Sequence, residues 1–169
     1  MPKRGRWSLV IAVLSGGAIG GCNFFGRPSP GGQVPEPINT MLPKTVRLSP
    51  FTGTKTFSEA GGVRGIDVSL QAIDSYGDPT KAFGNFRFEL YEFRPNNQDP
   101  RGDQVGVWEE DLLKPERNLL HWDNIAWAYK FKLKWRRSLP VGQKYVLVVV
   151  FTSPFTERKF AQREFVSGD

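Results

Sequence analysis

The clearest pattern in the chain lies between positions 125 and 136, where large apolar residues alternate first with alanine and then with lysine or arginine. This is the period of a β-strand that buries one face, so a strand is predicted over the whole segment. Similar but shorter alternations predict strands over residues 46–49, 66–74, 85–93, 105–112, 118–122, 144–152 and 158–166. Clusters of Gly, Pro, Asn and Asp separate these segments, as turns require.

These strands predict an all-β fold, because seven or eight strands in about 125 residues are typical of a two-sheet antiparallel β-sandwich. No segment carries an apolar helical stripe of three turns, and Pro115 interrupts the nearest candidate, residues 111–118. Residues 145–151 are apolar on both faces, which favours a central strand. The predicted core comprises Ile125, Trp127, Tyr129, Phe131, Leu133, Tyr145, Leu147, Val149, Phe86, Phe88 and Leu90.

The N-terminus has the order of an export signal. Basic residues at positions 3, 4 and 6 precede an apolar run over 9–14 and a group of small residues that ends at Gly21. The apolar stretch from Trp7 to Ile19 is shorter than the ~18 residues that a transmembrane helix needs. A cleaved signal over residues 1–21 is therefore predicted.

The only cysteine of the chain, Cys22, follows this signal directly. The segment Ile19-Gly20-Gly21-Cys22 resembles the bacterial lipobox. The resemblance implies that Cys22 receives a diacylglycerol, becomes the first mature residue and anchors the exported protein in membrane lipid. Asn23, which is not Asp, implies an outer membrane rather than an inner one under the commonest sorting rule. An ordinary secretory signal with a cysteine nearby is the alternative interpretation.

Residues 22–44 are expected to connect the lipidated cysteine to the folded domain. Five prolines and three glycines lie between positions 23 and 44, without hydrophobic periodicity. Segments of this kind favour extended polyproline II structure. The expected organisation is thus a signal over 1–21, a lipidated cysteine with its tether over 22–44, and a β-sandwich over 45–169.

Two short motifs resemble known sandwich families. Residues 139–145, Leu-Pro-Val-Gly-Gln-Lys-Tyr, resemble the tyrosine-corner approach of fibronectin type III and other immunoglobulin-like domains. Residues 74–79, Asp-Ser-Tyr-Gly-Asp-Pro, and the strand at 88–93 resemble the first hairpin of the transthyretin-like lipoproteins of type VI secretion systems. These resemblances imply an immunoglobulin-like or a transthyretin-like sandwich, and the second implies a secretion-system lipoprotein.

Net charge does not indicate a nucleic-acid partner. The chain has 23 basic and 17 acidic residues, and the predicted signal holds three of the basic ones and no acid. The mature chain therefore keeps 20 basic against 17 acidic residues, a net charge of +3, which is far from the strongly basic character of nucleic-acid-binding domains.

The distribution of charge along the chain is more informative. Residues 124–156 contain six basic residues and no acid, whereas residues 89–116 contain eight acids and three basic residues. One interpretation is that the two regions neighbour each other and form cross-strand ion pairs. The other is that the strand residues Lys130, Lys132, Lys134 and Arg136 form a basic strip that binds an acidic envelope protein, an anionic envelope polymer or lipid headgroups.

The sequence contains few residues in patterns typical of a catalytic or metal site. His121 is the only histidine, and no nucleophile motif accompanies it. One histidine and no free thiol do not indicate a zinc site. No catalytic residue, metal or cofactor is therefore expected, and a hydrolase that uses His121 with Asp123 is the alternative.

The sequence thus indicates a membrane-anchored envelope lipoprotein that acts as a non-catalytic binding, structural or assembly module. A carbohydrate-binding sandwich is the rival interpretation, because aromatic side chains stack on sugars and Trp122 is expected to be the most exposed tryptophan of the mature chain. The transthyretin-like secretion-system lipoprotein is a further alternative.

Overall fold

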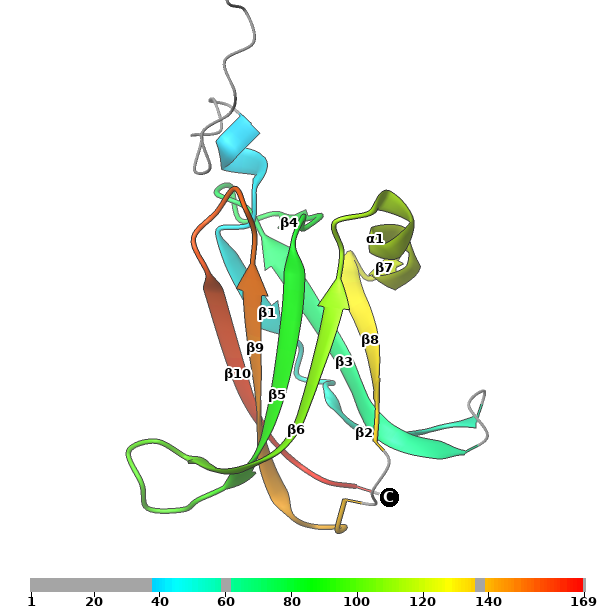
Figure 1. Ribbon diagram of the computed structural model, residues 1–169, viewed down its shortest axis with the longest axis vertical. Coiled ribbons are helices and arrows are strands. Elements are labelled where there is room, and N and C mark those ends of the chain that lie inside the picture. The colour runs from blue at the N-terminus through cyan, green and yellow to red at the C-terminus, as the bar shows by residue number, and fades with distance from the viewer. Residues whose placement is uncertain (1–37, 59–61, 136–138, 169) are drawn as a thin grey trace, which may run out of the picture.

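The computed structural model describes residues 38–58, 62–135 and 139–168 (Figure 1). The predicted signal, Cys22 and most of the tether lie outside these ranges. In chain order the elements are η1 (Ile38–Met41), β1 (Thr45–Leu48), β2 (Gly53–Phe57), β3 (Val63–Ile73), β4 (Pro79–Thr80), β5 (Asn85–Phe93), β6 (Arg101–Asp111), α1 (Pro115–His121), β7 (Trp122–Asp123), β8 (Ala128–Lys134), β9 (Lys144–Thr152) and β10 (Lys159–Val166).

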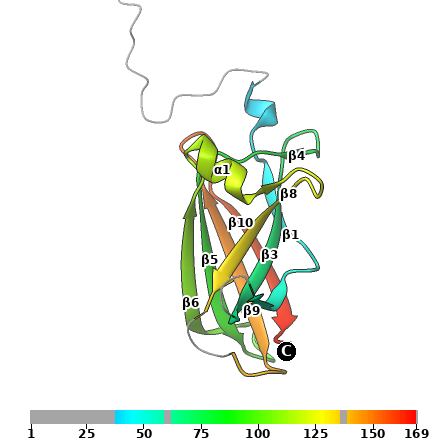
Figure 2. The same cartoon turned by 90° about the vertical axis from the view of Figure 1, so that its right-hand side faces the viewer.

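The strands form two antiparallel sheets that pack together (Figures 1 and 2). Sheet A has the order β1-β3-β8-β7, with β2 and β4 also paired to β3, and sheet B has the order β10-β9-β5-β6. This confirms the predicted all-β sandwich. Within the described ranges the strands exceed the predicted seven or eight because the short strands β2, β4 and β7 escaped prediction.

Seven of the strands, β1, β3, β5, β6, β8, β9 and β10, correspond to segments that the sequence predicted. The first, second and fifth of them, β1, β3 and β8, lie in sheet A. The seventh, sixth and third, β10, β9 and β5, lie side by side in sheet B, with β6 beyond β5.

The side chain of Tyr145 differs in one detail from a tyrosine corner. It lies buried at the start of β9, the position that the motif predicts. Its hydroxyl donates to the side-chain oxygen of Gln143 at 3.1 Å, whereas the hydroxyl of a tyrosine corner bonds to backbone. Burial raises the pKa of Tyr145.

The core consists of the inward faces of the two sheets, and Phe86 lies at its centre. Its ring centroid is 4.8 Å from that of Phe151, 5.5 Å from Phe131 and 5.8 Å from Tyr129. The predicted core residues Tyr129, Phe131, Leu133, Tyr145, Leu147, Val149, Phe86, Phe88 and Leu90 are all buried. The strand β9 is central in sheet B and buries Val146 and Val148 on its outer face as well.

Two predicted core residues, Ile125 and Trp127, are in fact exposed, with 94% and 60% of their surface accessible. The strand β8 begins only at Ala128, because β7 and β8 form a hairpin in which Asp123 pairs with Ala128. An oxygen of the Asp123 carboxylate accepts the backbone N–H groups of Ile125 and Ala126 at 2.9 and 3.1 Å. The apparent alternation over 125–127 therefore belongs to a turn.

The predicted strand over residues 118–122 is mostly the helix α1. Pro115 occupies its first turn, where the missing N–H of proline would have no helical partner in any case. The proline thus starts a helix here. At seven residues, this helix is too short to show the repeated apolar stripe by which helices are recognised.

The end of the sandwich that holds η1 is called the tether end here. The N–H of Ser75 donates to the carbonyl of Thr40 in η1 at 3.0 Å. The antiparallel registers place the connections 74–84, 112–127 and 153–158 at this same end, and Figure 1 shows η1, β4 and α1 there. The described connections 94–100 and 139–143 lie at the opposite end.

Candidate functional site

The predicted basic strip lies on the outer face of sheet A. Lys130, Lys132 and Lys134 alternate with buried residues along β8, and all three are exposed. These three side chains are called the lysine row. Because residues two apart in a strand are separated by about 6.7 Å, the row presents positive charge at regular intervals. Arg136, the fourth predicted member, lies outside the described residues.

The residues around the lysine row include both acidic and basic side chains. Directly across from Lys130, Lys132 and Lys134, β3 places Ser69, Asp67 and Gly65. The carboxylate of Asp67 is 2.9 Å from the ammonium of Lys55 on β2. Lys132 also lies 5.9 Å from the ring centroid of Phe57. Asp123, which pairs with Ala128 next to Lys130, lies on the same face. The described face therefore carries the carboxylates of Asp67 and Asp123 beside the ammonium groups of Lys55 and of the lysine row.

Cross-strand pairing with the acidic region does not account for the three described lysines of β8, because the strands of that region lie in the other sheet. The acidic region belongs to β5, β6 and the loops beside them, and β8 pairs with β3 and β7. Within sheet B, Arg87 bonds to Glu89 at 2.6 Å and to Glu109 at 2.7 Å. The hydrogen bond from Arg87 is the largest cause of the lowered pKa of Glu89. Glu89 and Glu109 thus have a basic partner in their own sheet.

Two further acids pair with arginines next to the turn between β5 and β6. Arg94 bonds to Asp103 at 2.8 Å, and Arg101 bonds to Asp99 at 2.7 Å. The hydrogen bonds from Arg101 hold the pKa of Asp99 at about 2. These two acids are thus engaged beside the β5–β6 turn and not by the lysine row of sheet A.

Trp122 is not the exposed tryptophan that the sequence suggests. It is half-buried in β7, where its ring meets the ring of Tyr129 edge-on at 5.0 Å. The ammonium of Lys81 lies 5.0 Å from its centroid. Because a sugar needs a free aromatic face to stack on, these contacts weaken the carbohydrate interpretation at Trp122. Among the tryptophans in the described ranges, Trp127 is the exposed one.

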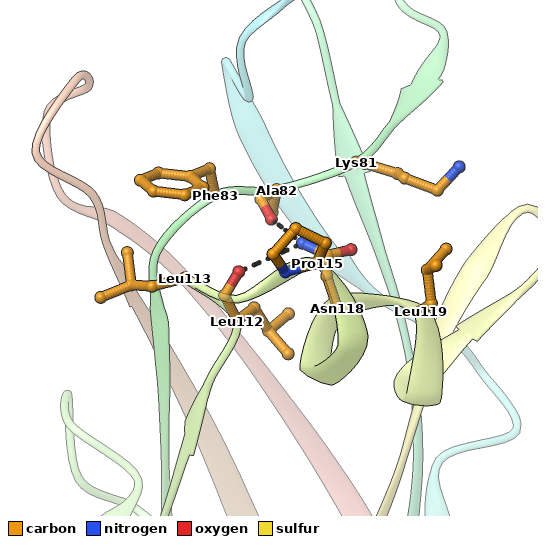
Figure 3. A pocket seen from close by; sticks show the side chains of 8 residues that line it. All are labelled: Lys81, Ala82, Phe83, Leu112, Leu113, Pro115, Asn118 and Leu119. Atoms are coloured by element: carbon orange, nitrogen blue, oxygen red, sulfur yellow. Dashed lines mark hydrogen bonds between the residues drawn. The ribbon is translucent and has the colours of Figure 1, made fainter.

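A cavity of about 370 Å³ opens at the tether end beside α1. Its walls are mainly apolar and include Phe83, Leu113, Pro115 and Leu119 (Figure 3). Sequence reasoning missed this cavity, because it forms where the β4–β5 connection meets a helix that was expected to be a strand.

A hydrogen-bond network behind the cavity attaches α1 to the core. The amide of Asn118 donates to the carbonyls of Ala82 at 2.5 Å and Leu112 at 3.3 Å (Figure 3). The Tyr129 hydroxyl donates to the Asn118 side-chain oxygen at 2.9 Å and accepts the N–H of Ala82 at 2.7 Å. Burial raises the pKa of Tyr129, so the hydroxyl stays protonated as a donor. The polar atoms of Asn118 are thus occupied by the fold.

His121 and Asp123 do not form a catalytic pair in this structure. The His121 ring packs against Phe131 with centroids 4.7 Å apart, and its Nδ1 lies 3.1 Å from the carbonyl oxygen of Lys130. Its Nε2 lies 3.5 Å from a carboxylate oxygen of Glu110. Asp123 is bonded to the backbone of its own turn. Both side chains thus serve local structure.

Comparison with protein-family models, with curated proteins and with solved structures finds no match to this chain. In the part of the chain that the structure describes, no helix combines the length and apolar character needed to cross a bilayer. The same residues contain no group of three or more His, Cys, Asp or Glu side chains placed to hold a metal ion. The described surfaces that stand out are the lysine row and the apolar tether end.

Proposed function

We propose that this protein is an exported, lipid-anchored module of the cell envelope that binds an acidic partner through the outer face of sheet A. The observation that carries the proposal is the lysine row, three exposed ammonium groups on one strand. The sequence supports the anchor, since Cys22 follows an export-signal pattern within a lipobox-like segment. The module is non-catalytic and serves binding or assembly, with an outer membrane as the expected location.

The lysine row suits a partner with extended negative charge. Ammonium groups on a regular spacing attract an acidic protein surface or an anionic polymer at long range, and salt screens this attraction. A rigid sheet also holds the charges in fixed positions, so binding does not require the backbone to reorganise. Glu89 and Glu109 of sheet B, already paired with Arg87, do not compete for the row.

Reversing the row should abolish binding to a polyanion. The variant changes Lys130, Lys132 and Lys134 to Glu, and its retention on a polyglutamate column is compared with that of the unaltered chain. We expect the variant to elute without retention. Because the three side chains are exposed, the free energy of unfolding should change little, by about 0.5 kcal/mol or less per site.

A control variant with the same change in net charge separates the row from overall charge. It carries Glu at Lys44, Lys114 and Arg158, which are exposed and lie off the outer face of sheet A. This control should keep most of its retention. Equal losses in both variants would show that net charge alone drives binding and would refute the row as the site.

Replacing Cys22 with Ser should release the protein from the membrane. Two or more acyl chains anchor a protein stably, because each buried CH₂ contributes about 0.8 kcal/mol, and serine cannot form the thioether. We expect the variant in the non-membrane fraction after cell fractionation, with the mass of the acyl groups missing. Asn23→Ser is the control and should stay with the membrane. An unchanged distribution and mass for the Cys22→Ser variant would contradict the anchor.

A further inference from the structure

The tether end exposes an unusual share of large apolar side chains. Nine of the fifteen large hydrophobic residues that are exposed among the described residues belong to η1 or to the connections at this end. Five of them, Leu113, Leu119, Leu120, Ile125 and Trp127, come from the single connection between β6 and β8 and are called the apolar tip. Exposed apolar groups gathered at one place mark a surface that contacts something apolar.

The fold holds the leucines of the apolar tip outward. The helix α1 has no buried residue, so packing of its leucines does not attach it to the sandwich. Asn118 fills this role through its bonds to Ala82, Leu112 and Tyr129. With Asn118 turned inward, the next two residues of the helix face other directions. Leu119 and Leu120 are accordingly exposed.

The β7–β8 turn presents the other two members in a similar way. Asp123 fixes the backbone at Ile125 and Ala126 by two hydrogen bonds. Trp127 follows with a φ of 50°, a conformation that side chains other than Gly, Asn and Asp seldom adopt. The turn therefore exposes an isoleucine and a tryptophan on a fixed backbone, where polar turn residues would be ordinary.

The position of the tether identifies the occupant of this surface. The described chain begins at Ile38, at the same end as the apolar tip, and fifteen residues lie between it and Cys22. At about 3.1 Å per residue this segment reaches roughly 50 Å at most. A lipid anchor on Cys22 thus keeps the tether end close to the bilayer. Because the anchor and the tether end belong to one chain, contact between the tether end and the bilayer is effectively intramolecular. Even a weak affinity of the apolar tip for lipid then suffices to keep the tip on the bilayer.

We infer that the apolar tip inserts into the headgroup region of the bilayer that anchors the protein, so that the sandwich stands on its tether end. Tryptophan and large aliphatic side chains are the residues that occupy this interface. The inference rests on the proposed lipid anchor. Insertion of the apolar tip also orients the lysine row relative to the bilayer. Because β8 begins at the tether end, the row extends away from the membrane along the strand.

The test uses the acylated full chain with one cysteine introduced for an environment-sensitive fluorophore. Leu119→Cys lies in the apolar tip, and Val141→Cys lies at the opposite end with nearly the same exposure, 60% against 59% for the native side chains. Acylation blocks Cys22, so the new thiol is the one that reacts. Each labelled protein is incorporated into phosphatidylethanolamine and phosphatidylglycerol vesicles, with and without spin-labelled lipid.

The fluorophore at position 119 should emit at shorter wavelength in vesicles and should be quenched by the spin-labelled lipid. The fluorophore at position 141 should show neither effect. Replacing Leu120, Ile125 and Trp127 with Ser in the Leu119→Cys chain should remove both effects, while the chain still floats with the vesicles through its anchor.

The outcomes separate the inference from the proposed function. A chain that floats with vesicles, but whose fluorophore at position 119 stays in water, would refute the inference and leave the anchor intact. A shift to shorter wavelength without quenching by the spin-labelled lipid, together with cross-linking between chains, would show that the apolar tip contacts a second copy of the chain. This result would also refute the inference. A chain without acyl mass at Cys22 that fails to float would refute the anchor and, with it, the inference.

Discussion

Replacement of Phe86 with alanine should lower the free energy of unfolding by about 3–5 kcal/mol, the cost typical of removing a buried aromatic ring. Phe86 is fully buried and contacts the rings of Phe88, Tyr129, Phe131 and Phe151. These neighbours come from both sheets, so the space that the alanine variant leaves empty lies between the two sheets. The rings around it are held on strands and can close it only in part.

Denaturant unfolding followed by tryptophan fluorescence measures this effect. The control is Phe160→Ala on β10, since Phe160 keeps 61% of its surface exposed. Exposed substitutions usually change stability by about 0.5 kcal/mol or less. Similar losses for the two variants would mean that Phe86 does not lie at the centre of the core.

A single added methyl group at Gly65 should also destabilise the fold, by about 1–3 kcal/mol, because the neighbouring atoms leave no room for it. A Cβ atom at this position would lie 2.3 Å from the carbonyl oxygen of Leu133 and 2.8 Å from the ring of Phe57. The first contact is with the backbone of β8, the neighbouring strand. The strands would have to separate, or Phe57 would have to leave its buried position.

Gly53→Ala is the matched control for Gly65→Ala. Gly53 lies on β2, next to β3, and a Cβ atom there would meet no atom within 4 Å. Alanine in an unstrained strand position is generally favoured over glycine by about 0.5–1 kcal/mol. We therefore expect thermal midpoints to move in opposite directions for the two variants. A stabilised Gly65→Ala variant would contradict the close packing of β2, β3 and β8.

The long strands could be predicted from sequence because their patterns are local. The bounds of β5 and β9 agree with the predicted segments 85–93 and 144–152, and alternation in β8 identifies its buried face from Tyr129 onward. The strand β2 could not be predicted in this way. Its sequence is mostly polar, and its buried residue, Phe57, packs over a glycine in another strand, a long-range contact that no local pattern records.

The candidate surfaces also differ in whether a local sequence pattern predicts them. The exposure of Lys130, Lys132 and Lys134 follows from alternation alone, and the structure confirms it. Which residues lie opposite the row depends on strand order, and the sequence did not reveal that the acidic region belongs to the other sheet. The apolar tip was hidden for a different reason, because apolar residues are assigned to a core by default.

The backbone conformation of Trp127 lowers the stability of the β7–β8 turn. A left-handed conformation at a residue other than glycine costs on the order of 1–3 kcal/mol, and Trp127 has a φ of 50°. Selection for folding stability alone would favour glycine or asparagine at this position. A bulky aromatic residue there thus trades stability for a fixed placement of its indole ring, so the most stable variants of this turn should be the ones that have lost the ring.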